Sequence, residues 1–415
     1  MALTNETYDN RPEAVAFAFG RVWYAGAQTT RWSTKIFFSQ VLLDNNRAGK
    51  CYQDADPTAE EINALIDTDG GVLSLPEAGR VVKMIPLTSV IIVLAENGVW
   101  AIQAGREGFS PLAFTRNQIT EVGCISKKSV IKIEDSVMYA ADNGIYQIGA
   151  NEQGKIVATN ITEPKVDSLY NSITFTQKAN SVAIYDYKKK EYSLYYGTGN
   201  NTVGSINLRL KNGAWYPYRF DVNSSELPAT FYMAIPFYSP RSRESSGTKV
   251  LVYSSSAEGS FYTINEYSDK NFNDFGVAPI DAYLKTSAIT LDNPQFDKQA
   301  TYATFYFDIT ETGVNGVDDT MNLVYTSPSS CLMTPYWSWS NSTKLGKQGR
   351  ERQIYRLPDT PLDSNGDFDI GTDVLVVRDR VKGQGKALQF QFQTEPNKNM
   401  RLIGYTVNVS MDGSY

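Results

Sequence analysis

The chain has 415 residues, of which 42% are hydrophobic and 20% are charged. Such a length is sufficient for two or three domains with large cores, and the composition is that of a folded protein rather than a disordered one. The formal net charge of −6 argues against a protein that binds nucleic acid through a basic surface. It is compatible with a conduit through which DNA slides, because like charges prevent sticking.

Residue types that are absent or rare exclude several kinds of active site. Histidine is absent, so the chain cannot form a Ser-His-Asp triad, a Cys-His pair or a histidine-ligated metal site. Cys51, Cys124 and Cys331 lie far apart without Cys-x-x-Cys spacing, which argues against zinc or a redox dithiol. We interpret them as buried or free thiols of a protein made in a reducing cytoplasm. We expect no signal peptide in residues 1–10, and apolar runs such as residues 90–95 are too short to span a bilayer.

The first elements along the chain are short strands followed by one helix. The apolar runs between residues 15 and 24 and at residues 36–39 are typical of strands. Residues 56–66 are the best helix candidate, because Asp56 can cap the helix and Pro57 suits its first turn. Two glutamates near this end also complement the helix dipole.

Tight turns recur along the middle of the chain at a regular interval. In chain order they are Asn97-Gly98, Asn143-Gly144, Lys188-Lys189-Lys190, Asn212-Gly213 and Glu258-Gly259. The first three lie about 46 positions apart, as do the last two, and Asn-Gly favours the positive φ angles of two-residue hairpin loops. A hairpin about every 23 residues gives a four-stranded unit about every 46, close to the ~40–50 residues of a propeller blade. We therefore predict an all-β fold in which residues 1–275 form a β-propeller-like body.

A second pattern begins after residues 267–278, where Asn, Asp and Gly dominate and where we place a domain boundary. Beyond it, apolar and polar residues alternate strictly in residues 302–309, 388–393 and 403–410. The residues expected on one face of the last run are Ile403, Tyr405, Val407 and Val409. A period of two with one wet face predicts a C-terminal antiparallel β-sandwich over residues 276–415.

A series of short motifs runs along nearly the whole chain. In order they are Arg11-Pro12-x-x-Val15-Ala16-Phe17-x-x-Gly20-Arg21-Val22-Trp23-Tyr24-Ala25-Gly26, Ile36-Phe37-Phe38-Ser39, Asp54-Ala-Asp56-Pro57, Leu94-Ala-Glu-Asn97-Gly98-Val-Trp100-Ala-Ile102, Tyr185-Asp186-x-x-Lys189-x-Glu191-Tyr192-x-Leu194, Ala214-Trp215-Tyr-Pro-Tyr218, Gly383-Gln384-Gly385-Lys386-Ala387-Leu388-Gln389-Phe390 and Arg401-Leu402-Ile403-Gly404-Tyr405. Taken together, they resemble the tail tubular protein B or tail nozzle family of short-tailed, podovirus-type bacteriophages. Their order along the chain, more than any single motif, carries the resemblance.

The resemblance implies a structural virion protein rather than an enzyme. It implies a homo-oligomeric ring, typically a hexamer, that is assembled in the host cytoplasm and lies at the tail tip below an adaptor ring. Such a ring extends the DNA exit channel, retains the genome, guides its ejection and seats the tail fibres, with no cofactor and no stable small-molecule ligand. Longer relatives carry a sizeable region ahead of the Arg-Pro motif, which here begins at Arg11, so the motifs do not imply how this chain docks.

Two charged segments are candidate binding sites. Lys188, Lys189 and Lys190 either face DNA in the channel or form a solvated hairpin tip. The second segment resembles the first half of a calcium loop, with oxygen ligands at alternate positions, namely Asp363, Asn365, Asp367 and Asp369. Phe368 and Val374 stand where an EF-hand needs Gly and Glu, so a solvated acidic turn is the alternative.

Aromatic residues suggest both core positions and one interface. Tyr336, Trp337 and Trp339 lie in a predicted loop, where they either anchor a neighbouring subunit or partner, as aromatic residues do at interfaces, or pack locally. The tryptophans in strand patterns, which we expect in the core, are Trp23, Trp100 and Trp215.

Two rival functions remain beside the structural one. The first is a carbohydrate-binding adhesin or receptor-binding propeller module, which would repeat aromatic and acidic pockets in each blade, a repetition that the sequence lacks. The second is a polysaccharide-cleaving propeller enzyme that uses Glu96 and Asp142 as paired acids. Both acids also precede hairpin turns, where acidic residues are ordinary, and we expect no catalytic residues.

Overall fold

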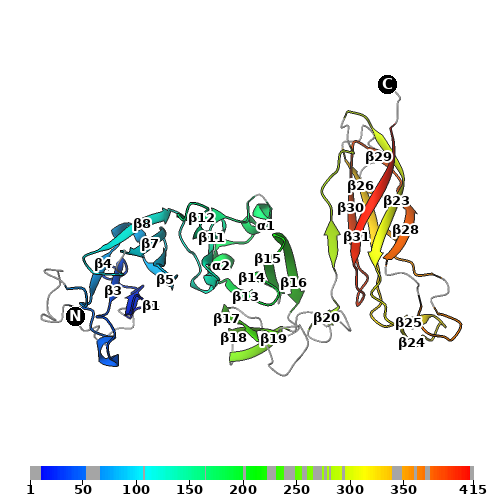
Figure 1. Cartoon of the computed structure of the whole chain (residues 1–415). Helices are drawn as coiled ribbons and strands as arrows, with labels where there is room; N and C mark the ends of the chain where they lie inside the picture. Colours follow the sequence, from blue (N-terminus) through cyan, green and yellow to red (C-terminus); the bar gives the residue numbers. More distant parts are fainter. Residues whose placement is uncertain are drawn as a thin grey trace. The chain divides into compact units, whose positions relative to one another are not determined.

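The computed structural model gives the chain a fold that consists almost entirely of β-strands (Figure 1). The residues that it describes are 11–52, 66–105, 108–163, 165–199, 202–221, 230–237, 248–254, 259–264, 273–274, 278–279, 282–291, 295–338, 348–358, 362–369 and 374–411. The helix expected over residues 56–66 lies outside them, except for Ile66.

The chain divides into two units, Met1–Thr263 and Ile264–Tyr415. The boundary expected from the sequence, at residue 276, lies twelve positions further along. The short helices are α1 Asp167–Asn171 and α2 Phe175–Ala179, with the 3₁₀ helices η2 Asn45–Arg47, η3 Pro76–Ala78 and η4 Lys127–Ser129. No helix in the described part of the chain is long and apolar enough to cross a membrane.

The first unit consists of sheets made from consecutive antiparallel strands, which we call the first to fifth blades. The strands of the first two blades are β1 Ala14–Ala18, β2 Arg21–Ala25, β3 Lys35–Phe38 and β4 Gly71–Ser74, then β5 Val81–Pro86, β6 Val90–Ala95, β7 Gly98–Ala104 and β8 Phe114–Thr120. The remaining strands are β9 Ile131–Ile133, β10 Ser136–Ala141, β11 Gly144–Ala150 and β12 Ile156–Asn160, then β13 Val182–Asp186, β14 Glu191–Gly199, β15 Thr202–Arg209 and β16 Ala214–Asp221, and finally β17 Thr230–Phe237, β18 Thr248–Ser254 and β19 Gly259–Ile264. This series of four-stranded meanders, with three strands in the last, is the propeller-like body that the sequence predicts.

The repeat length is slightly larger than the sequence spacing indicates. The second to fifth blades begin at residues 81, 131, 182 and 230, which gives intervals of 50, 51 and 48 residues. The expected 46-residue interval joined hairpins that are not equivalent. Asn143-Gly144 lies between the second and third strands of its blade, whereas Lys188-Lys189-Lys190 lies between the first and second strands of the next.

The Asn-Gly turns also differ from the expected loop geometry. In the second blade Ala95 pairs with Gly98, so the loop residues are Glu96 and Asn97 and the glycine already belongs to the next strand. Neither loop residue has a positive φ angle. The reason for the glycine is close packing, because a Cβ atom on Gly98 would lie 2.6 Å from the carbonyl oxygen of Thr120 on the neighbouring strand.

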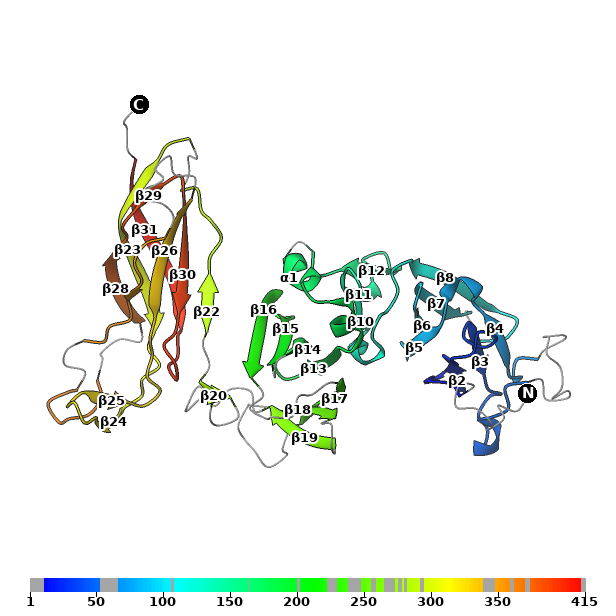
Figure 2. The ribbon, with the colours of Figure 1, turned by 180° about the vertical axis from the view of Figure 1, so that it is seen from behind.

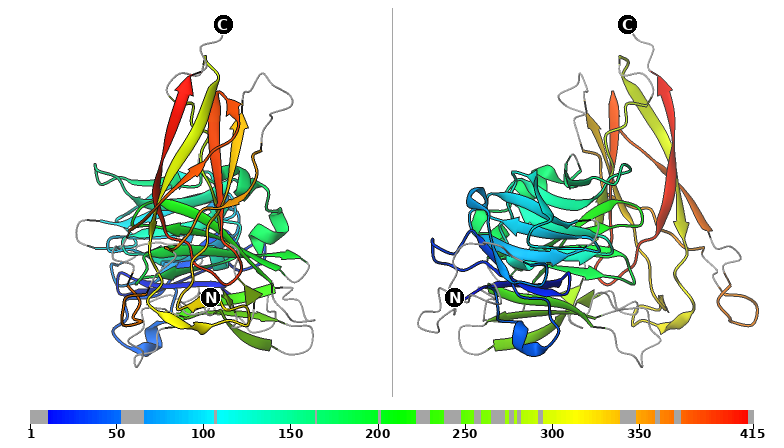
Figure 3. Two further views of the ribbon diagram at one scale, coloured as in Figure 1. Left: turned by 90° about the vertical axis from the view of Figure 1, so that its right-hand side faces the viewer. Right: turned by 60° about the vertical axis from the view of Figure 1, so that its left-hand side comes forward.

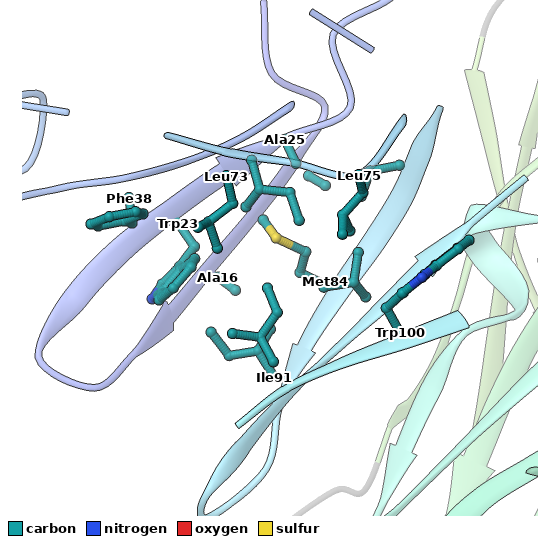
Figure 4. Packing of buried hydrophobic residues seen from close by; sticks show 14 of the residues in the cluster. Ala16, Trp23, Ala25, Phe38, Leu73, Leu75, Met84, Ile91 and Trp100 are labelled. Carbon is teal, nitrogen blue, oxygen red and sulfur yellow. The ribbon is translucent and has the colours of Figure 1, made fainter. Parts of the chain in front are cut away.

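Successive blades pack face to face through separate hydrophobic clusters. One cluster lies between the first and second blades, a second between the second and third, and a third between the third and fourth. Figure 4 shows the first cluster, with Ala16, Trp23, Ala25, Phe38, Leu73, Leu75, Met84, Ile91 and Trp100 labelled. Trp23 and Trp100 are buried there as expected, and Trp215 packs, partly buried, against the third cluster.

The second unit is an antiparallel sandwich whose long strands run side by side (Figures 2 and 3). Its sheets contain β22 Tyr283–Lys285, β30 Ala387–Gln393, β26 Leu332–Ser338 and β27 Arg352–Gln353 on one side, and β28 Val374–Arg380, β23 Lys298–Asp308, β29 Gln384–Gly385 and β31 Leu402–Met411 on the other. Two small hairpins are formed by β20 Asn273–Asp274 with β21 Ala278–Pro279 and by β24 Val314–Val317 with β25 Leu323–Tyr325. Its core joins Phe305 and Phe307 of β23 to Phe390 and Phe392 of β30, which are the positions that the alternation predicts.

The prediction of which residues of β31 face the core is wrong at the start of that strand. The pairing of β23 with β31 shifts register between Tyr306 and Phe307, so that Phe307 lies opposite Leu402. A β-bulge of this kind turns the following side chains over. Leu402 therefore packs against the core, and Ile403, which the alternation placed inside with Tyr405, is 61% exposed.

Candidate functional site

The three lysines proposed to face DNA form the tip of the hairpin between β13 and β14. Asp186 shapes this turn, because its Oδ1 atom accepts hydrogen bonds from the backbone amides of Lys188 at 2.9 Å and Lys189 at 3.0 Å. Lys190 adopts a left-handed conformation, with φ of 51°, which completes the reversal. The structure therefore presents the lysines on a turn that a buried carboxylate builds.

Two buried carboxylates lie at the base of this hairpin, in the fourth blade, whose strands β13 to β16 are labelled in Figure 2. Asp186 pairs with Glu191 across the two strands, and both side chains are buried. The Tyr216 hydroxyl donates to Oε2 of Glu191 at 2.6 Å, and Nε of Arg209 lies 3.9 Å from the same atom. The hairpin thus carries two acidic residues beside its three lysines, and Arg209 adds a further basic group next to Glu191.

The acidic segment of the second unit folds as a self-contained turn. Oδ1 of Asp363 accepts hydrogen bonds from the amides of Asn365 at 2.9 Å and Asp367 at 2.8 Å. The amide of Asp363 donates to the carbonyl of Asp367, and Gly366 adopts a φ of 83°. Among the described residues, which include Asp369, no group of three or more acidic or cysteine side chains could hold a metal ion. The geometry favours the solvated acidic turn over the calcium loop.

A second turn in the same unit has the same design. Oδ1 of Asp318 accepts from the amides of Thr320 at 2.9 Å and Asn322 at 2.8 Å. The hydrogen bonds from Asn322 and Thr320 hold the pKa of the exposed Asp318 carboxyl below its ordinary value. Because two acidic turns use an aspartate in this way, a carboxylate that binds its own backbone amides explains the pattern that resembles a calcium loop.

The two acids considered for glycoside cleavage are engaged in separate ion pairs. Glu96 lies 3.1 Å from Nε of Arg80, which belongs to the segment before β5. Asp142 is exposed, with Oδ1 3.6 Å from Nζ of Lys178. The two acids occupy equivalent hairpins of successive blades, between the second and third strands, and each ties its hairpin to a neighbouring segment.

Lys178 is a residue whose role the sequence did not indicate. Its side chain is buried, its Nζ atom donates to the carbonyl of Asp142 at 2.6 Å, and it lies 4.7 Å from the centroid of the Tyr170 ring. It comes from α2, whose first turn carries a capping box between Thr174 and Gln177. A lysine in a short helix gives no sequence signal of burial, since it becomes buried only when the third and fourth blades pack.

Arg21 is the second buried cation that the sequence did not single out. Its side chain is fully buried, and its guanidinium donates to the carbonyl oxygens of Ser39 at 2.8 Å, Asp67 and Asp69. Burial lowers the pKa of Arg21 from its ordinary value. Arg21 thus fixes both ends of the long connection between β3 and β4, and its position in line with Trp23 on the inner face of β2 is the only sequence signal of this role.

The aromatic cluster lies on a strand rather than in the expected loop. Trp337 belongs to β26 and is buried in the sandwich core, with Nε1 donating to the carbonyl of Lys382 at 3.2 Å. It is therefore not available to anchor a neighbouring subunit. Tyr336 points the other way, is half-buried, and carries Nζ of Lys285 at 4.5 Å from its ring centroid. Trp339 lies outside the described residues.

The three cysteines are free thiols, as the sequence indicates. Burial raises the pKa of Cys51, Cys124 and Cys331 to about 12 in each case. A thiol with such a pKa is almost fully protonated at neutral pH, so none of the three is an activated nucleophile.

Comparisons with known proteins do not place the chain in a family. No family model matches it, and no curated protein matches it. Among solved structures, the N-terminal domain of Nup159 aligns over 93% of this chain and 89% of its own length, with 11% identity and a TM-score of 0.31. The WD40 domain of SCAP from fission yeast aligns over 92% of this chain and 84% of its own length, with 10% identity and a TM-score of 0.30. The Aleuria aurantia lectin in complex with alpha-methyl-L-fucoside aligns over 60% of this chain and 73% of its own length, with 15% identity and a TM-score of 0.29. Similarities at this level carry no argument about function.

Proposed function

We propose that the chain is a structural virion protein, a tail nozzle subunit of a short-tailed bacteriophage. In this role it forms an oligomeric ring, a hexamer, that extends the DNA exit channel, retains the genome and guides its ejection. The observation that carries the proposal is the order of the motifs along the chain. Those that fall within the described residues lie on paired strands, from β1 and β2 at residues 11–26 to β31 at residues 401–405.

The charge and the chemistry of the described residues support a structural role. The candidate acids Glu96 and Asp142 are held in separate ion pairs, and the chain contains no histidine. Each copy in a ring contributes a formal charge of −6, which opposes tight binding of DNA. An acidic channel of this kind lets DNA slide, and the lysines at 188–190 are candidates for transient contact with its phosphates.

The proposed partners follow from the same role. The subunit binds further copies of itself, an adaptor ring above it and the tail fibres, and it resides at the tail tip after assembly in the host cytoplasm. Its function needs no cofactor. The sandwich unit, with its rigid core around Phe305 and Phe390, is a candidate for presenting a fixed surface to one of these partners.

Negative-stain electron microscopy tests the proposal. The purified chain is imaged alone and after incubation with tail-stripped particles of its phage, with stripped particles of an unrelated phage as the control. We expect six-fold rings with an axial hole, or density added at the tail tip of the matched particles alone. Compact monomers that never join the particle would overturn the proposal and favour a carbohydrate-binding or receptor-binding propeller module.

A further inference from the structure

The first blade has two apolar faces, of which one is buried and the other is only partly covered by the residues that the structure describes, such as Trp32 beside Phe37 and Ala48 beside Tyr24. Its inner face, which includes Ala16 and Trp23, packs against the second blade. Its outer face consists of Val15, Phe17, Val22, Tyr24, Phe37 and Val72. A sheet with one face in water alternates apolar and polar residues, whereas the strands of this blade are apolar on both sides.

The strand register assembles the outer residues into continuous rows. Val15 pairs with Tyr24, Tyr24 with Phe37, and Phe37 with Val72, so one row crosses all four strands. Phe17 pairs with Val22 in the next row. Val15 and Phe17, on the edge strand β1 of this sheet, are 57% and 60% exposed.

The polar residues on this outer face stand at its border. Lys35 pairs with Ser74 at the end of β3 and β4, and Nζ of Lys35 lies 4.7 Å from the centroid of the Trp32 ring. An apolar centre with a polar border is typical of a surface that another part of a protein covers. The remaining question is which element covers it.

The fifth blade, at the other end of the series, also has strands with apolar sequences. Its first strand, β17, lies beside β13 and β14 of the fourth blade. The sequence of β17, Thr-Phe-Tyr-Met-Ala-Ile-Pro-Phe, is apolar at consecutive positions, as is the Val-Leu-Val-Tyr run of β18. Runs of this kind are typical of strands that are covered on both faces. The sequence of the fifth blade therefore predicts a second neighbouring sheet in addition to the fourth blade. The outer face of the first blade predicts the same at the start of the series.

We propose that the outer face of the first blade is the seat of the fifth blade of the same chain, so that the two ends of the series close the propeller. Three of the preceding pairs of consecutive blades pack in this way through hydrophobic clusters, the fifth blade lies against the fourth through β17, and the new interface continues the same arrangement. Contact with a partner in the same chain does not depend on protein concentration, whereas contact with a second copy does. The inference concerns the fold and does not depend on the proposed role in a phage tail.

Photo-crosslinking identifies what covers this face. In Phe17→p-benzoylphenylalanine, irradiation inserts the side chain into whatever lies within a few ångströms, and mass spectrometry locates the joined peptide. We expect a crosslink to residues 230–264, in a product that runs as a single chain on a denaturing gel. The variant Val15→p-benzoylphenylalanine, in the adjacent row, gives the same answer if the first variant fails to fold.

A mixture of isotopically labelled and unlabelled chains distinguishes the two sources of a crosslink. Closure within one chain gives no products that combine a labelled with an unlabelled peptide, at low or high concentration. Mixed products would show that a second copy covers the face and would overturn the proposal, as would the absence of any protein crosslink. Leu112→p-benzoylphenylalanine is the matched control, because Leu112 is 68% exposed on the turn before β8, outside the outer face. We expect no crosslink from it to residues 230–264.

Discussion

The two units of the chain bury their strands in different ways. In β6 of the second blade all six residues are buried, because the first and third blades cover both faces of the sheet. In β30 of the sandwich, buried and half-buried residues alternate along Phe-Gln-Phe-Gln, because one face meets the opposite sheet and the other does not. The comparison teaches that alternation identifies a sandwich strand but is lost in a blade strand, where only the repeat of turns and runs reveals the fold.

The largest expected change in the free energy of unfolding is in the sandwich. There, a substitution on the buried side of a sheet should destabilise the protein far more than one on the exposed side. Phe305→Ala removes a fully buried ring that contacts Phe390, Phe392 and Tyr405, and we expect it to lower the free energy of unfolding by about 3–5 kcal/mol. Val376→Ala, on the neighbouring strand β28, removes a side chain that is 57% exposed, and should change it by less than about 0.5 kcal/mol.

Urea unfolding with hydrogen exchange of β30 measures this difference and assigns it to the second unit. Equal losses in the two variants would show that the sandwich has no distinct wet face on β28. A large loss for Val376→Ala in particular would indicate that another surface covers this strand in solution.

The blade should show the opposite behaviour, with two adjacent residues of equal importance. Ile91 packs between the first and second blades and Ile92 between the second and third, and both are fully buried. We expect Ile91→Ala and Ile92→Ala each to cost about 2–5 kcal/mol of the free energy of unfolding. Urea unfolding measures both losses, and each variant is the control for the other. If one of them proves nearly neutral, the second blade has a solvated face and the series of packed blades is wrong at that point.

The sequence allowed the fold class and the order of the elements to be predicted, but not the details that depend on contacts between strands. The all-β class and the sandwich follow from local patterns such as the alternation around Phe305 and Phe390. The exposure of Ile403 could not be predicted, because the bulge that causes it is a property of the pairing between β23 and β31. The 46-residue interval was close to the length of the blade repeat. However, it related turns that connect different pairs of strands within their blades.

The candidate sites were harder to predict, since burial changes the meaning of a residue. Trp337 was assigned to a loop and is a core residue, because the sequence around it does not show which partner strand covers it. Arg21 and Lys178 were not predicted to be buried, because a charged side chain is normally exposed and both become enclosed only when separate segments meet. The acidic turn at Asp363 resembles a metal loop because the same residue types also bind backbone amides.

A buried cation in the first blade gives the next prediction. Arg21→Lys keeps the charge but replaces a fork of donors with a single ammonium group, so it cannot serve the carbonyls of Ser39, Asp67 and Asp69 together. One unsatisfied buried carbonyl costs about 1–3 kcal/mol, and we expect a loss of that size. Arg31→Lys, at an exposed position of the same blade where the guanidinium lies 4.6 Å from the centroid of the Trp32 ring, is the matched control, and it should have a small effect because lysine keeps the charge for this exposed contact. Similar stabilities of the two variants in urea unfolding would contradict the anchoring role of Arg21.

The smallest expected effect is a pH dependence that belongs to the sandwich. The hydrogen bond from Nζ of Lys398, at 2.6 Å, and then the one from the Ser330 hydroxyl, at 2.9 Å, lower the pKa of Glu395 below its ordinary value of 4.5. A depressed carboxyl pKa contributes stability above pH 4.5 that is lost as the pH falls through the lower, folded value. The contribution is small because the side chain is 39% exposed and solvent screens the pair.

We therefore expect the stability of Glu395→Gln to depend less on pH than that of the unchanged chain below pH 4.5, and to match it more closely at the acid end of the titration. Glu152→Gln, which removes an exposed carboxyl from the turn between β11 and β12 of the first unit, is the control for the loss of one acid. Unfolding followed at several pH values between 3 and 6, about the range in which carboxyl groups titrate, measures the difference. If the two variants respond alike, the hydrogen bonds of Glu395 do not stabilise the ionised form, and the turn after β30 resembles the solvated turns of the first unit more than a fixed part of the sandwich.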